Sequence, residues 1–216
     1  MRYDSYITTS QGDTMTQNRD THFFAILSRM RYIDRWALMR NSRPDTLSEH
    51  SLEVAMIAHA LCVIGNVRHG RSLDANRAAL LGIYHDAPEI ITGDLPTPVK
   101  YYSSRITDAY HEVESAAKQS LLDSLPDDLR PAYEDVLSPA ASSEDDAYLL
   151  RLLKAADKIS ALVKCIEEAG SGNGEFKSAE VSTRAMVEEM AQELPEVRDF
   201  VDEFLPSFGA TLDELL

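Results

Sequence analysis

The sequence predicts an all-α protein, and three observations lead to this expectation. Apolar residues recur at helical spacing over most of the chain, for example from Phe23 to Ile33. Residues that cap helices, such as Thr46 and Asp74, stand directly before several of these apolar runs. No segment has the alternation of a half-buried strand. We expect residues 21–216 to form one domain, and the polar, aperiodic residues 1–20 to be a disordered extension.

Local signals place the boundaries of successive helices. Thr46 to Glu49 matches a capping box, and Pro88 cannot continue the helix that precedes it. Ser143 begins a long helix that Gly170 ends. The expected helices run from Thr21 to about Trp36, from Thr46 to about Gly65, from Asp74 to Asp86, from Ser103 or Ser104 past Leu121, over 127–137, from Ser143 to Gly170, over 178–193 and over 196–204, with a short turn from Thr211.

Two helices, those predicted from Thr46 and from Asp74, are expected to contribute apolar side chains to the core. In the helix that begins at Thr46, we assign five apolar side chains to the core. In the later one the apolar lead-in to residue 85 is expected to be buried. The residues concerned are Leu52, Met56, Ile57, Leu61 and Ile64 in the first case, and Leu80, Leu81 and Ile83 in the second.

Composition excludes several classes of function. With 21 basic and 36 acidic residues the net charge is −15, which disfavours nucleic-acid polymers and anionic membranes as partners. No continuous apolar run has membrane-spanning length, and we expect no secretory signal because the first residues lack an apolar segment. Cys62 and Cys165 lie in apolar helical patterns, as buried thiols of a cytoplasmic protein do. Arginines cluster between residues 29 and 43, where a small anionic substrate would be favoured.

His85 and Asp86 are the most informative pair in the chain. A neutral imidazole nitrogen and a carboxylate oxygen together suit a divalent metal ion. The pair follows an apolar segment, so it is expected in the interior, where a metal ion would compensate the buried charge of Asp86. The dipeptide alone is weak evidence, and its neighbours decide how it is interpreted.

Those neighbours carry a resemblance to a known family. His50 stands one turn into an earlier helix and Asp157 lies inside a later one, giving the order His…His-Asp…Asp. This order resembles the HD-domain superfamily of metal-dependent phosphohydrolases, whose fold is an HD-domain, PDEase-like helical bundle with a buried metal site. Four short sequence motifs narrow the resemblance to bacterial HD-type 5′-deoxynucleotidases of the YfbR kind. They are Arg35-Trp36, Ser48-Glu49-His50-Ser51, His85-Asp86-Ala87-Pro88-Glu89 and Thr92-Gly93-Asp94-Leu95-Pro96-Thr97-Pro98-Val99-Lys100.

The resemblance implies that His50, His85, Asp86 and Asp157 hold a metal. From the residues alone, His50 could equally be a core histidine and Asp157 a solvent-exposed partner of nearby basic residues. Two nitrogen and two carboxylate ligands suit manganese, iron, cobalt or zinc better than calcium. The resemblance favours cobalt or manganese, with copper, zinc, iron and magnesium as further candidates. Some relatives hold two ions with extra histidines before the last aspartate, but only His111 lies in that interval here, so we expect one ion per chain.

The resemblance also implies the reaction, which is hydrolysis of 2′-deoxyribonucleoside 5′-monophosphates by a cytoplasmic homodimer. Arg35 would neutralise the phosphate, Glu89 would act as general acid or base, and Asp94 would hold a water or the sugar hydroxyl. Trp36 would form an apolar wall beside the sugar. The implied substrate contacts are Arg35, Trp36, His50, Asp86, Asp94, Leu95, Pro96 and Thr97. Two alternatives remain open: another HD phosphohydrolase, acting on diesters or nucleoside polyphosphates, and a non-catalytic nucleotide-binding module.

Overall fold

The structure, a computed structural model, describes residues 21–216; the expected extension at 1–20 lies outside the described residues. Helices account for nearly all of the regular structure, as the sequence predicts. In order, the elements are α1 (Phe23–Leu27), the 3₁₀ helix η1 (Ser28–Tyr32), β1 (Asp34–Arg35), β2 (Asp45–Thr46), α2 (Leu47–Arg68), α3 (Ala75–Tyr84), α4 (Glu89–Thr92), α5 (Thr97–Lys100), α6 (Ser104–Asp123), α7 (Arg130–Leu137), α8 (Glu144–Gly170), η2 (Gly174–Phe176), α9 (Lys177–Glu193), α10 (Pro195–Glu203), η3 (Leu205–Gly209) and α11 (Leu212–Leu215).

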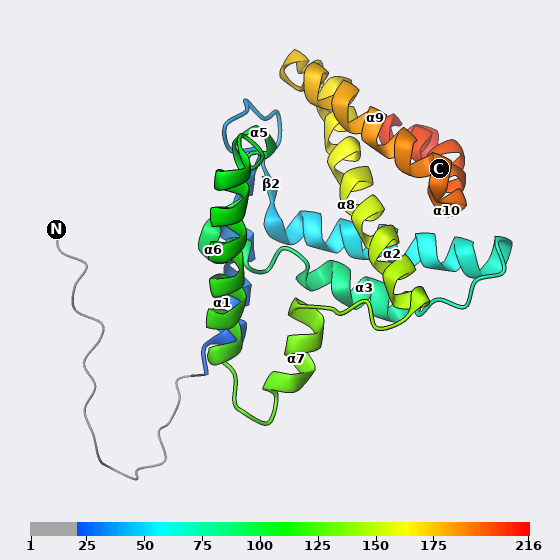
Figure 1. The fold of residues 1–216 in the computed structure, drawn as a ribbon. Helices are drawn as coiled ribbons and strands as arrows, with labels where there is room; N and C mark the ends of the chain where they lie inside the picture. The colour runs from blue at the N-terminus through cyan, green and yellow to red at the C-terminus, as the bar shows by residue number, and fades with distance from the viewer. Residues whose placement is uncertain (1–20) are drawn as a thin grey trace, which may run out of the picture.

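The main core lies between α2, α3 and α8, with α9 and α10 packed at the far end. Figure 1 shows α8 crossing α2 steeply, while α3 runs beside α2. Each of the three helices begins at a predicted cap: Thr46 with Glu49 in a capping box, Asp74, and Ser143. The caps satisfy backbone N–H groups that have no partner inside the helix, which fixes where each helix starts. Consequently the positions of side chains near these starts and along α8 are well defined.

A glycine brings α3 close to α2. A Cβ atom on Gly82 would lie 2.6 Å from the Ala55 Cα atom, so any larger residue would push the two helices apart. Gly82 stands one turn before His85, and Ala55 stands just over one turn after His50. The close approach therefore sets the separation of these two histidines.

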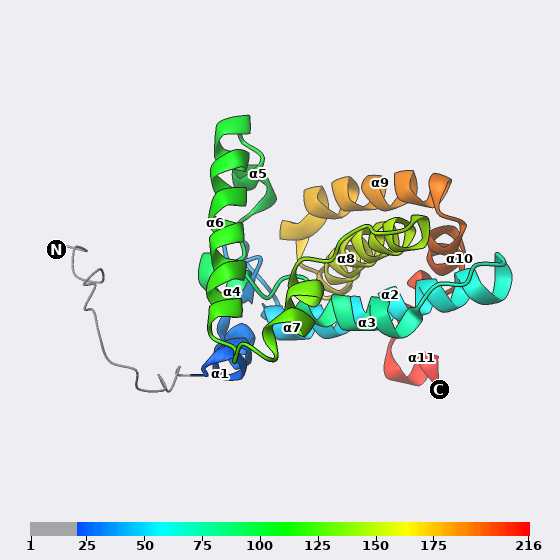
Figure 2. The same cartoon turned by 60° about the horizontal axis from the view of Figure 1, so that its bottom comes forward.

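A smaller core lies under α6, on the other side of the α3 end. Its buried members are Phe23, Ala87, Leu121, Leu122, Leu125 and Leu137. Figure 2 shows α6 standing beside α4 and α5, away from α9 and α10. Ala87 directly follows the His85-Asp86 pair, so this second core holds the chain on the far side of the pair.

The expectation that the chain has no strand is wrong. Asp34–Arg35 and Asp45–Thr46 form an antiparallel pair in which Asp34 lies opposite Thr46 and Arg35 opposite Asp45. The first helix is correspondingly short, since α1 continues only as the 3₁₀ helix η1 and ends at Tyr32. Two residues per strand are too few for an alternating pattern to be visible in the sequence.

The predicted buried faces of α2 and α3 are partly wrong. Leu52 and Met56 are 59% and 58% exposed, and Leu80 and Ile83 are also exposed. The remaining predicted positions, Ile57, Leu61, Ile64 and Leu81, are buried, together with small residues that were not singled out. Apolar residues occur on all sides of α2, so the pattern does not distinguish its buried side from its exposed one.

The helix α2 also meets a criterion that the sequence analysis did not anticipate. The helix has 22 residues, and the mean hydropathy of an 18-residue segment within it is 1.4, so by length and composition it could cross a membrane. The helix lies in the middle of the bundle against α3, α8 and α10, and 56% of that segment is buried, as in the core helix of a bundle.

Cys62 and Cys165, as predicted, are buried and free. Burial raises the pKa of the Cys62 thiol to about 12, so it stays protonated.

Candidate metal centre

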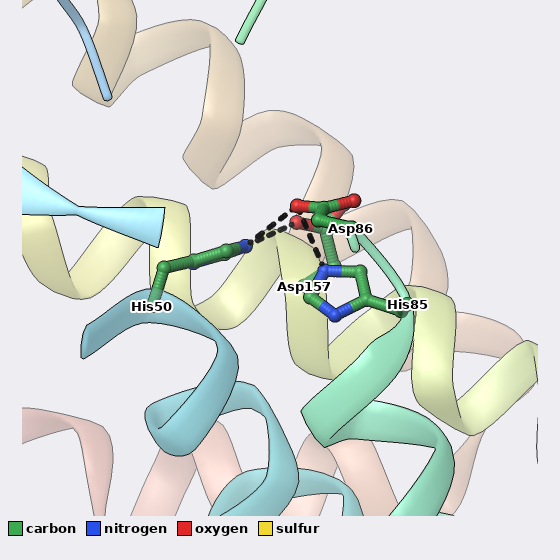
Figure 3. Close-up of side chains that lie close together, drawn as sticks. All are labelled: His50, His85, Asp86 and Asp157. Carbon is green, nitrogen blue, oxygen red and sulfur yellow. Dashed lines mark ion pairs between the residues drawn. The ribbon is translucent and has the colours of Figure 1, made fainter. Parts of the chain in front are cut away.

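Four side chains from α2, α8 and the end of α3 come together; His50 is buried and the other three are half-buried. His50 lies in the first turn of α2, His85 and Asp86 directly follow the last residue of α3, and Asp157 stands in the middle of α8. One ligand atom from each lies within 4.8 Å of the others. Figure 3 shows the two imidazoles approaching the two carboxylates from different sides. The structure thus brings together all four residues named from the sequence.

The donor atoms converge on a common point rather than pairing with one another. His50 Nε2 lies 3.2 Å from an Asp157 oxygen and 3.5 Å from an Asp86 oxygen. His85 Nε2 lies 3.0 Å from the same Asp86 oxygen. Within residues 21–216, both Nε2 atoms are buried and neither makes a hydrogen bond of acceptable geometry. Buried nitrogens in this condition are costly, and a cation bound between two nitrogens and two carboxylates would satisfy them.

The electrostatics of the cluster favour added positive charge. Burial alone would raise the pKa values of Asp86 and Asp157, but the adjacent histidines hold both well below the usual range. Burial lowers the pKa of His85, yet the neighbouring carboxylates, chiefly Asp86, raise it to about 9. Without a metal ion the two carboxylates therefore retain a proton on His85. A divalent ion would supply the same compensation with a larger charge.

Glu89 lies one turn beyond Asp86, at the start of α4. Burial, together with repulsion from Asp86 and Asp94, raises the pKa of Glu89 to about 9, although Arg35 and Lys100 oppose the shift. Its Oε2 atom is buried and has no hydrogen-bond partner in the described part of the chain. A carboxylic acid that remains protonated near neutral pH can donate a proton to a leaving group.

Arg35 is buried rather than being a surface arginine, with 8% of its area exposed. It ends β1, and its guanidinium lies 3.5 Å from Asp86 and 3.6 Å from Asp45 on the opposite strand. The strand pair that the sequence analysis missed therefore points the Arg35 guanidinium toward the four clustered donors. Arg35 therefore places a buried positive charge beside Asp86.

Trp36 and Asp94 come together from distant parts of the sequence. The backbone N–H group of Trp36 donates a hydrogen bond of 3.3 Å to the Asp94 carboxylate. Trp36 has φ of 55°, a left-handed conformation that is uncommon for a residue other than glycine. Its ring packs edge-on against Phe176, with 5.4 Å between ring centres. Of the remaining predicted contacts, Leu95 and Pro96 are half-buried and Thr97 is exposed at the start of α5.

A buried network that the sequence analysis missed holds the loop between β1 and β2. Glu168 is 2% exposed and accepts hydrogen bonds from the backbone N–H of Ser42, from Asn173 and from Lys164. Lys164 also donates to the Arg43 carbonyl at 2.6 Å. The signal available in the sequence was the Lys164–Glu168 spacing of one helical turn, which is common on exposed helices and gave no reason to expect burial.

Comparison with known proteins agrees with this geometry. The family model described as "5′-deoxynucleotidase YfbR-like" matches residues 22–208. The 5′-deoxynucleotidase YfbR of Escherichia coli is 45% identical over 197 residues, covering 91% of this chain and 96% of that protein.

Solved structures show the same fold. An HD-domain phosphohydrolase from Listeria innocua superposes with a TM-score of 0.74 at 25% identity, covering 88% of this chain and 90% of that one. A cyanophage S-2L HD phosphohydrolase superposes with a TM-score of 0.56 at 19% identity, covering 86% of this chain and 95% of that one. The family match spans most of the chain, including the four clustered donors, Arg35, Glu89 and Asp94. This chain belongs to the YfbR-like 5′-deoxynucleotidase family.

Proposed function

We propose that this protein is a metal-dependent 5′-deoxynucleotidase that hydrolyses 2′-deoxyribonucleoside 5′-monophosphates to the deoxynucleoside and phosphate. The observation that carries the proposal is the convergence of His50, His85, Asp86 and Asp157 next to a buried arginine and a glutamate whose pKa is raised. Family membership supplies the substrate class, since the Escherichia coli relative is named for this activity.

The metal ion, held by the four clustered residues, would polarise a phosphoryl oxygen and acidify a water molecule. Arg35 would stabilise the negative charge on the phosphate oxygens, exchanging its contact with Asp86 for one with substrate. Glu89 would donate its proton to the 5′ oxygen as the bond between phosphorus and that oxygen breaks. The attacking water supplies the oxygen that phosphate gains, and the nucleoside leaves with a 5′ hydroxyl group.

The sugar would lie between Trp36 and the segment from Asp94 to Thr97. One Asp94 oxygen accepts a hydrogen bond from the backbone N–H of Trp36, and the other oxygen can accept one from a sugar hydroxyl group or a water. The Trp36 ring, fixed by Phe176, offers an apolar surface at which an extra 2′ hydroxyl group would lose hydrogen bonds to water. Leu95, Pro96 and Thr97 complete this side of the proposed site.

Further parts of the proposal concern the ion and the assembly. The mixed nitrogen and oxygen donors suit cobalt or manganese, with copper, zinc, iron and magnesium as further candidates. We propose one ion per chain, one catalytic domain over residues 21–216, a homodimer and a cytoplasmic location. Two free buried thiols are consistent with a reducing compartment.

The test is phosphate release after the purified protein has been stripped with a chelator and reloaded with a single metal. The substrate panel should include deoxyribonucleoside and ribonucleoside 5′-monophosphates, deoxynucleoside 3′-monophosphates, a deoxynucleoside triphosphate and a phosphodiester. We expect release from the 5′ deoxynucleotides only after reloading with cobalt or manganese. A preference for the diester or the triphosphate would assign the chain a different hydrolytic reaction, and binding without any turnover would indicate a nucleotide-binding module.

A further inference from the structure

His50 takes part in a hydrogen-bond chain that the proposed reaction does not use. Its Nδ1 atom lies 2.9 Å from the Ser160 hydroxyl oxygen. That hydroxyl group in turn donates to Glu53 at 2.5 Å. Glu53 stands one turn after His50 on α2, and Ser160 stands one turn after Asp157 on α8. The chain therefore links the two helices directly behind the metal cluster.

The hydroxyl group of Ser160 has one proton, which fixes the direction of the chain. Ionised Glu53 can only accept, so the Ser160 proton points toward it. The Ser160 oxygen must then accept a proton from His50 Nδ1. A neutral imidazole has only one N–H group, so His50 Nε2 is left with a lone pair facing Asp86 and Asp157. This is the tautomer that a metal ligand requires.

His85 reaches the same state by a simpler route. Its Nδ1 atom lies 2.8 Å from the Gly82 carbonyl oxygen, which can only accept a proton. When His85 is neutral, the backbone alone therefore directs its Nε2 lone pair toward the cluster. A serine hydroxyl group, in contrast, could either donate to His50 or accept from it. Glu53 removes this ambiguity.

Burial raises the pKa of Glu53, whereas the hydrogen bond that Ser160 donates opposes this shift and stabilises the carboxylate. Glu53 and His50 both line a cavity of about 110 Å³, which has room for water. Cations and anions both face this cavity, so the charge of Glu53 is not isolated. The other charged groups that line it are Arg43, Asp45, Glu49, Lys164 and Glu167.

We propose that Ser160 and Glu53 are positioning residues that hold His50 as the tautomer with a free Nε2 lone pair, and that they thereby set the metal affinity of the site. This inference rests on the proposed function, because it takes His50 as a metal ligand. Groups that orient a metal-binding histidine commonly change metal affinity by about 10–100-fold when they are removed.

The first test compares Ser160→Ala with Ser51→Ala in the full-length protein. Ser51 adjoins His50 on the same helix and is also buried, but its hydroxyl group has no hydrogen-bond partner within residues 21–216. Cobalt and manganese dissociation constants would be measured by competition with a chromophoric chelator. We expect weaker binding by about 10–100-fold for Ser160→Ala and a wild-type value for Ser51→Ala.

The second test uses Glu53→Leu and Glu53→Gln. A glutamine oxygen can still accept the Ser160 proton, whereas leucine leaves that proton free to turn toward His50 Nδ1. We therefore expect Glu53→Leu to weaken metal binding as Ser160→Ala does, and Glu53→Gln to stay close to wild type. Nitrogen-15 NMR of the metal-free imidazoles should show His50 protonated on Nδ1 in wild type and moving toward Nε2 protonation in Glu53→Leu.

The outcomes separate this inference from the proposed function. Wild-type metal affinity in folded Ser160→Ala, or equal affinities for Glu53→Leu and Glu53→Gln, would overturn the positioning role. If the wild-type protein binds no metal, the proposed function fails instead, and the NMR spectra still decide the tautomer. If Ser160→Ala does not fold, the two Glu53 variants carry the decision.

Discussion

The proposed metal cluster (His50, His85, Asp86 and Asp157) and the neighbouring hairpin of residues 33–46 lie side by side but are built differently. The clustered side chains come from α2, α8 and the end of α3, and the main core fixes these helices. The hairpin has only two residues per strand and contains a left-handed Trp36. It is held by polar contacts, chiefly the hydrogen bonds that Glu168 accepts from its backbone.

This difference suggests that the clustered donors determine metal binding and the hairpin determines substrate recognition. Apolar burial holds the helices that carry the proposed ligands, so substitutions in the hairpin should leave these ligands in place. Hydrogen bonds to a few buried charged groups hold the hairpin, so single substitutions there should move Arg35 and Trp36. Metal binding and substrate recognition should therefore respond to different substitutions.

The largest effect is expected from His85→Ala or Asp86→Ala. Removing either residue leaves an incomplete set of donors, so metal content and phosphate release should both fall to the level of the chelator-treated protein. Elemental analysis and the phosphate assay measure this, and circular dichroism should show unchanged helix content. His59→Ala, an exposed histidine on the same helix as His50, is the matched control. Full metal content in either variant would remove the residue concerned from the proposed ligand set.

Glu89→Gln should have the next largest effect, and it should separate chemistry from binding. Loss of a general acid typically reduces turnover by about 10²–10⁴-fold. Metal content and nucleotide affinity should stay near wild type, because Glu89 is not among the four clustered donors. Glu112→Gln on the exposed side of α6 serves as the control. A decrease in kcat of less than about threefold would reject the assigned role.

The same residue predicts a pH dependence. Glu89 must be protonated to donate, so activity should fall as pH rises through its pKa. That pKa is about 9 without a metal, and bound positive charge should lower it. The loaded enzyme should therefore lose activity at a pH below 9, and this alkaline limb should vanish in Glu89→Gln. Identical profiles for both proteins would assign the limb to another group.

The sequence predicted the helices and the clustered donors far better than the hairpin. Helix caps such as Thr46 and Asp74 are local signals, and they stand where they were expected. The proximity of His50 and Asp157 depends on how α2 and α8 cross, and only the family resemblance predicted it. The burial of Glu168 was missed because the loop backbone at Ser42, which donates to it, is distant in sequence. Ser160 and Glu53 were missed because an isolated serine and an acid one turn after a histidine carry no distinctive pattern.

The hairpin should set the preference for deoxyribose. A 2′ hydroxyl group placed against Trp36 would lose water without gaining a partner, at a cost of about 1–3 kcal/mol. We expect kcat/KM for dAMP to exceed that for AMP by about ten- to a hundredfold, and Trp36→Ala to reduce this ratio. The same comparison for dUMP and UMP tests whether the effect is independent of the base. Selectivity that survives Trp36→Ala would transfer the role to the segment from Asp94 to Thr97.

The smallest effect on turnover is expected from Glu168→Gln, which loosens the hairpin without touching the metal cluster. The substitution removes the negative charge opposite buried Lys164 and weakens the hydrogen bonds to the loop. Loss of hydrogen bonds to a charged group costs about 1.5–3 kcal/mol of unfolding free energy. KM for dAMP should rise several-fold while metal affinity stays unchanged, and Glu167→Gln, at the next position on α8, should alter neither.

Acid stability provides an independent measurement of the same contact. Burial alone would raise the pKa of Glu168, but hydrogen bonds from Lys164, Asn173 and Ser42 lower it from 4.5 to about 2. The carboxylate therefore stabilises the folded state at neutral pH, and this contribution is lost as the pH falls from about 4.5 toward 2. Urea denaturation at pH 7 and pH 3 should show a smaller loss of stability on acidification for Glu168→Gln than for wild type. If the variant instead weakens metal binding as strongly as it raises KM, the hairpin and the metal cluster form one coupled unit, and the division between them does not hold.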